Sequence, residues 1–129
     1  MRFGYTIAYV ADPAASLDFF ERAFGLVRRF LHESGGYGEL DTGATTLAFA
    51  QHAVARENLG HDYVAADTSA APLGLEIGLL ADDVPAAVQR AVAAGATLLR
   101  APVHKPWGQT VAYVRTPDGT LVELCTPMG

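Results

Sequence analysis

Two glutamates inside apolar segments are the residues of this sequence best suited to chemistry. Glu76 stands in the segment LEIGLL and Glu123 in VELC. A carboxylate that is buried without a partner costs free energy, so its presence in an apolar strand needs a reason. Two neighbouring carboxylates can bind a cation or act as an acid and a base. The other interpretation, that one or both face solvent on the outside of an open sheet, stays open at the level of sequence.

Histidine and tryptophan supply the next candidates, because imidazole binds metals and accepts protons near neutral pH. Three of the four histidines lie beside turns or in a polar segment, where we expect surface positions: His32, His52 and His61. His104 directly precedes the segment Lys-Pro-Trp-Gly, which contains Trp107, the only tryptophan. The flat face of Trp107 suits stacking on an aromatic or cationic ligand, or packing on the sheet as a lid.

The sequence lacks the motifs of several other kinds of functional site. There is no glycine-rich phosphate loop and no G-x-S-x-G nucleophile motif. A single cysteine, Cys125, cannot form a disulfide within the chain, and we expect it to be a small buried side chain.

The elements that must position these residues occur twice. Residues 3–10 predict a strand, and Asp12-Pro13 predicts the start of a helix that Gly25 ends. Strands are predicted at 26–32, 37–40 and 45–50. The order of this half is therefore β-α-β-β-β.

The second half repeats that order. A strand is predicted at 75–80, a helix between Asp83 and Gly95, and strands at 97–103, 109–115 and 120–126. Asp83 and Gly95 follow Asp12 and Gly25 by 71 and 70 residues, which indicates an internal duplication. Between the halves, residues 52–73 show no sustained period and are predicted to be a linker.

Composition limits the function. The chain has 129 residues, 50% hydrophobic and 18% charged, which predicts one compact domain. Its net charge of −5 opposes phosphate binding, so we expect no nucleic-acid partner. No stretch has the roughly 20 apolar residues of a membrane span, and no signal-peptide core is present. We expect a soluble cytoplasmic protein without a membrane partner.

Three stretches carry a family resemblance: residues 5–24, 76–95 and 105–126, the last with PWGQ, then PDG, then a strand that contains glutamate. Together they resemble the vicinal oxygen chelate superfamily, which includes glyoxalase I, bleomycin-resistance proteins and extradiol dioxygenases. The resemblance implies an α+β fold of two βαβββ modules, residues 3–51 and 74–127, joined by the linker 52–73. It also implies that curled sheets form an open cup, usually completed in a homodimer.

The resemblance also implies a set of site residues. Metal ligands in this family come from the first and last strands of each module, positions that correspond here to Tyr5, Phe49, Glu76 and Glu123. Only Glu123 has the expected type, and Phe49 cannot bind a metal. Two carboxylates without imidazole suit zinc, iron or nickel poorly, so we expect no cofactor; a hard divalent ion held with water is the alternative. The predicted ligand-binding residues are Tyr5, Phe49, Glu76, His104, Trp107 and Glu123.

The favoured hypothesis is a metal-free protein of the bleomycin-resistance type, which binds a drug-like, cationic or aromatic small molecule. The alternatives are a metal-dependent lyase, isomerase or dioxygenase, and a metal-independent enzyme with Glu76 or Glu123 as general base. Whether the protein is an enzyme remains open, because a fold does not fix an activity.

Overall fold

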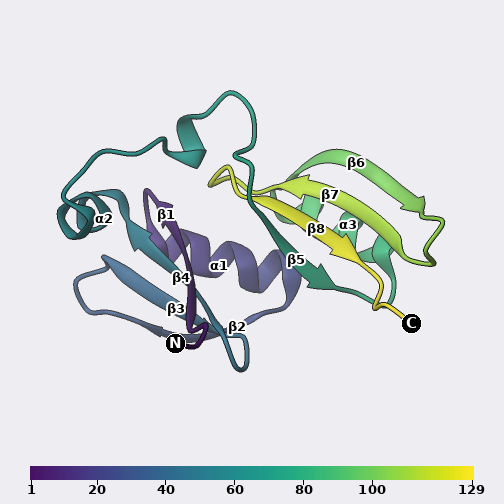
Figure 1. Cartoon of the computed structure of the whole chain (residues 1–129), viewed down its shortest axis with the longest axis horizontal. Coiled ribbons are helices and arrows are strands. Elements are labelled where there is room, and N and C mark those ends of the chain that lie inside the picture. Colours follow the sequence, from purple (N-terminus) through teal and green to yellow (C-terminus); the bar gives the residue numbers. More distant parts are fainter.

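The computed structural model describes all 129 residues and contains two modules of the predicted order β-α-β-β-β (Figure 1). The first consists of β1 (Tyr5–Val10), α1 (Pro13–Phe24), β2 (Val27–Leu31), β3 (Tyr37–Asp41) and β4 (Thr46–Gln51). The second consists of β5 (Glu76–Leu80), α3 (Val84–Ala94), β6 (Thr97–His104), β7 (Thr110–Arg115) and β8 (Leu121–Cys125). The α+β fold class predicted from the sequence is confirmed.

Each module folds its strands into one mixed sheet of the same topology. Sheet A has the order β1-β4-β3-β2, and sheet B has the order β5-β8-β7-β6. In each sheet the first strand pairs parallel with the last, and the remaining pairs are antiparallel. Because these two strands are paired, the first and last strands of each module lie side by side, and neither sheet closes on itself.

Both long helices begin and end where the sequence predicts. The Asp12 carboxylate accepts a hydrogen bond from the Ala14 amide at 3.1 Å, and Asp83 does the same for Ala86 at 3.1 Å. Gly25 ends α1 in the left-handed conformation, at φ 70°. No helix is long and apolar enough to span a bilayer.

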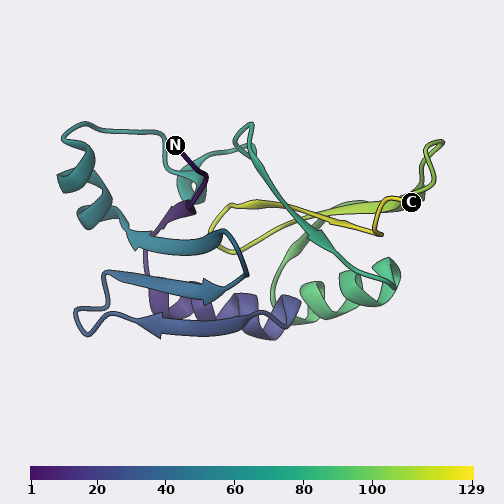
Figure 2. The same cartoon turned by 60° about the horizontal axis from the view of Figure 1, so that its bottom comes forward.

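A single hydrophobic core lies between the helices and the sheets. The helices α1 and α3 pack against each other on the same side of the molecule (Figure 2), and each covers one face of its own sheet. Phe20 and Leu17 of α1 are fully buried there, as are Val114 and Val122 of sheet B. The face of each sheet that lies opposite its helix is called its open face below.

The linker is more ordered than the sequence predicts. It contains a helix, α2 (His52–Leu59), and a 3-10 turn, η1 (Ala66–Thr68). Only one residue of α2, Ala55, is buried, so the helix lacks the apolar stripe from which a sequence pattern could be recognised. The Gln51 side chain makes no capping hydrogen bond either, which removes the second signal of a helix start.

Candidate functional site

The structure brings Glu76 and Glu123 together on the open face of sheet B. In the parallel pairing of β5 with β8, Glu76 lies opposite Leu121 and Glu123 lies opposite Gly78. The alternate residue Val122 is fully buried against the core, so the glutamates point the other way. The two are therefore diagonal neighbours on one face, and are called the carboxylate pair below.

The electrostatics of this face reflect two acids in close proximity. Partial burial raises the pKa of Glu76, and the neighbouring Glu123 raises it further through hydrogen bonding and negative charge. Tyr113 lies opposite Glu123 on β7, and burial, then the charges of Glu123 and Glu76, raise the pKa of its phenol. Burial and the same two charges raise the pKa of the Cys125 thiol. An added positive charge would relieve this repulsion.

Phe49 was predicted to face a ligand, and the structure corrects that prediction. Its side chain is fully buried in the core, with its ring centroid 5.0 Å from that of Phe20. Tyr5 pairs with Thr46 just as Glu76 pairs with Leu121, so the residue of sheet A that corresponds to Glu123 is Ala48.

The cause of the error is the length of one connection. Five residues, 116–120, join β7 to β8, but only four, 42–45, join β3 to β4. A shift of one residue along a strand moves a side chain to the opposite face. The prediction that Phe49 corresponds to Glu123 does not count this extra residue, and it therefore named a core position in place of the open-face position Ala48.

Sequence reasoning missed one acid on the open face of sheet A. Glu39 lies opposite Ala48 and is only 8% exposed. It accepts a hydrogen bond from the Tyr37 hydroxyl at 2.7 Å, and an Arg29 nitrogen lies 3.7 Å from its other oxygen. A glutamate inside the segment YGELD was the available signal.

The other predicted site residues lie apart from the carboxylate pair. Tyr5 is 58% exposed at the start of β1, on the open face of sheet A. His104 lies opposite Thr110 at the end of the β6–β7 hairpin, three residues along β7 from the partner of Glu123. Trp107 occupies the turn beyond and donates a hydrogen bond to the Gln109 side chain at 2.8 Å. Of the predicted site residues, only Glu76 and Glu123 are thus neighbours across paired strands.

The donors at the four family positions do not fit a transition metal. Tyr5, Ala48, Glu76 and Glu123 offer one phenol, a methyl group and two carboxylates, without nitrogen or sulfur. Within the chain, no group of three or more His, Cys, Asp or Glu side chains is arranged to hold a metal ion. The arrangement suits a proton shared between two acids or an organic cation.

Comparison with known proteins agrees with this architecture. The model of the Glyoxalase/Bleomycin resistance protein/Dioxygenase superfamily matches residues 2–124. The chain belongs to this superfamily. No curated protein matches the sequence.

Several solved structures share the fold. A glyoxalase-related enzyme from Fulvimarina pelagi has 22% identity and a TM-score of 0.83, with 98% of this chain and 88% of that chain covered. A glyoxalase/bleomycin resistance protein/dioxygenase family enzyme from Burkholderia phytofirmans PsJN has 24% identity and a TM-score of 0.80, with 95% and 96% covered. TioX from Micromonospora sp. ML1 has 23% identity and a TM-score of 0.67, with 98% of both chains covered.

Proposed function

We propose that this superfamily member is a metal-free binding protein of the bleomycin-resistance type, which takes a drug-like organic cation with an aromatic part. The observation that carries the proposal is the carboxylate pair, two acids side by side on a sheet face that no helix covers. Burial and then Glu123 raise the pKa of Glu76, and a cation placed between the two acids would lower the repulsion between them. The ring of Tyr113 beside Glu123 offers an aromatic surface to the same ligand.

The net charge supports the same ligand class. At −5 the whole chain attracts cations toward its surface, and the attraction is strongest where acids cluster. The family positions in sheet A lack nitrogen and sulfur donors, which supports binding without a transition metal. The proposal includes a homodimer, because the open faces leave large apolar side chains such as Ile7 and Leu99 more than 40% exposed.

A second candidate is a metal-independent lyase or isomerase that uses the carboxylate pair. Its support is the adjacency of the two carboxyl groups on one face, together with the raised pKa of Glu76, since one member of such a pair can donate a proton as a general acid while the other accepts one as a base. This enzyme would turn over a substrate that the binding protein only holds. The enzyme would be favoured if the protein forms a product from a cationic aromatic compound and if Glu76→Gln and Glu123→Gln both abolish that reaction.

Calorimetric titration with benzyltrimethylammonium tests the binding proposal. We expect Glu123→Gln and Glu76→Gln each to weaken binding by about three- to tenfold, the effect of losing one partly screened charge. Glu57→Gln, which removes the same charge from the exposed surface of α2, is the matched control and should bind like the parent. Equal affinity in all four proteins would refute the site, and retention of stoichiometric zinc, nickel or iron after dialysis would refute the metal-free reading.

Sedimentation at micromolar concentration tests the homodimer. The expected mass is twice the 13.6 kDa of one chain. A mass of one chain would show that the open faces are tolerated in water without a second copy.

A further inference from the structure

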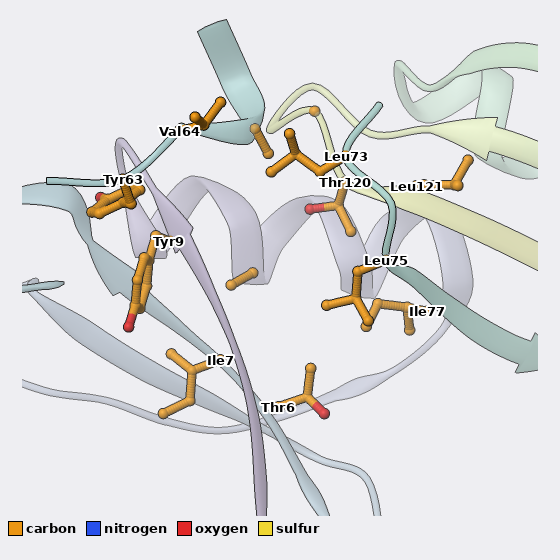
Figure 3. Close-up of a pocket in the computed structure, with 13 residues that line it drawn as sticks. Thr6, Ile7, Tyr9, Tyr63, Val64, Leu73, Leu75, Ile77, Thr120 and Leu121 are labelled. Carbon is orange, nitrogen blue, oxygen red and sulfur yellow. The ribbon is translucent and has the colours of Figure 1, made fainter. Parts of the chain in front are cut away.

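A small pocket lies between the two modules, outside the carboxylate pair. It has a volume of about 190 Å³ and is bounded by β1, by β5, by the start of β8 and by the linker residues 63–75. Figure 3 shows Tyr9 and Tyr63 on one side of it and Leu75 and Ile77 on the other. We call this space the seam pocket and residues 63–75 its roof segment.

The lining of the seam pocket has no formal charge at neutral pH. Ten of its thirteen residues are hydrophobic, and none of the thirteen is Asp, Glu, Lys, Arg or His. Neither member of the carboxylate pair lines it. A charged ligand would lose its hydration there without gaining a partner, so the chemistry of the pocket selects a neutral molecule.

The first attachment of the roof segment is a hydrogen-bonded row of side chains. One nitrogen of the His52 ring bonds to the Tyr63 hydroxyl, and the other lies 2.8 Å from the Asp67 carboxylate. The Arg56 guanidinium stacks over the Tyr63 ring at 4.9 Å. The ring that walls the pocket is therefore held from both its edge and its face.

The second attachment comes from the last hairpin of the chain. The Arg115 guanidinium donates hydrogen bonds to the carbonyls of Ala66 and Ser69, at 2.9 and 2.8 Å. A Cβ atom built on Gly119 would lie 2.1 Å from the Ala66 carbonyl oxygen, so only glycine permits this contact. The roof segment is consequently fixed before any ligand arrives, which reduces the entropy lost on binding.

We propose that the seam pocket is a second binding site, for a neutral, flat aromatic molecule of one or two rings. Its volume exceeds that of engineered apolar cavities of about 150 Å³ that bind benzene. Tyr9 and Tyr63, with centroids 4.8 Å apart at 55°, present a wall suited to tilted ring packing. Thr6 and Thr120 are among the lining residues, and a hydroxyl of this kind can hydrogen-bond one polar atom of a ligand. This site does not depend on the function proposed above.

Calorimetric titration of the full chain with indole, a neutral two-ring probe, tests the site. Leu73→Trp places bulk in the pocket and should weaken indole binding at least tenfold. Leu59→Trp, the same change at an exposed leucine of α2 outside the pocket, and Glu123→Gln should each change the affinity less than twofold. Thermal unfolding checks that the variants fold, and Leu75→Trp replaces Leu73→Trp if the latter does not.

Three results would overturn the proposal. The first is no binding of indole at millimolar concentration, which is also the outcome if a side chain of a second copy fills the pocket. The second is unchanged binding in the folded tryptophan variant. The third is equal weakening by Glu123→Gln, which would place indole at the carboxylate pair instead.

Discussion

The two sheets share one topology and one pairing register, but the acidic side chains on their open faces have opposite environments. In sheet A the open-face acid Glu39 is nearly buried and is satisfied by Tyr37 and Arg29. In sheet B the carboxylate pair has no partner among the ion pairs of the structure, and burial, then the neighbouring Glu123, raise the pKa of Glu76. The two modules thus differ: one holds an acid that is satisfied within its own sheet, and the other holds two acids without an ion-pair partner, where we propose that an organic cation binds.

Matching irregularities in the edge strands explain part of the difference. The register shifts between Arg28 and Phe30 in β2 and between Leu98 and Arg100 in β6, at corresponding places. The residue within the first irregularity is Arg29, whose guanidinium nitrogens lie 3.7 Å from Glu39 and 3.2 Å from Asp41. The residue at the corresponding place within the second irregularity is Leu99, which carries no charge that could pair with an acid of sheet B.

The largest loss of stability should come from substitution of Phe49, which tests whether this side chain belongs to the core or contacts a ligand. Phe49→Ala should lower the free energy of unfolding by about 3–5 kcal/mol, because it leaves a cavity beside Phe20. Urea unfolding measures the change. Phe49→Leu, which keeps most of the volume, should lose clearly less, and benzyltrimethylammonium should bind both folded variants like the parent.

A smaller effect should distinguish the acids of the two sheets. Glu39→Gln removes a charged acceptor from Tyr37 and Arg29, and should lower the free energy of unfolding by about 1–3 kcal/mol. Glu123→Gln removes a repulsion and should leave stability unchanged or slightly higher. Equal losses in the two variants by urea unfolding would contradict the proposed difference between the sheets.

The smallest effect concerns pH. The folded chain holds the Glu76 proton more tightly than the unfolded chain does, since its pKa lies above the ordinary 4.5. The free energy of unfolding should therefore fall as pH rises from 4.5 through the raised pKa, and this contribution should be absent in Glu76→Gln. Because Glu76 is largely exposed, solvent screening limits the difference to a few tenths of a kcal/mol. A series of urea titrations between pH 4 and 7 measures it. A free energy of unfolding of the parent that rises with pH relative to that of Glu76→Gln would have the wrong sign.

Most of the fold could be predicted because its signals are local. Helix caps such as Asp12 and Asp83 mark their own boundaries, and apolar segments mark the strands. The recurrence of the whole order then identified two modules. The short helix α2 escaped because it buries a single residue and lacks a capping side chain.

The site was harder to predict because it depends on pairing between distant strands. Glu76 and Glu123 were recognisable from charge in an apolar setting, since each signal lies within one strand. The position equivalent to Glu123 in sheet A depends on the length of a connection, and one extra residue between β7 and β8 exchanged Ala48 for Phe49. The attachment of the roof segment by Arg115 joins residues 49 apart in sequence and has no local signature at all.

That long separation bears on the order in which the chain becomes structured. Ala66 is synthesised well before Arg115 and Gly119, yet its carbonyl group is held in position by contacts with these two residues. Contacts that close long loops form late, because the closure entropy must be met before they stabilise anything. The strands of the first module can pack against α1 before residues 63–75 become ordered, because the order of these residues depends on the final hairpin. Pulsed hydrogen exchange during refolding should find the amides of the roof segment among the last to gain protection.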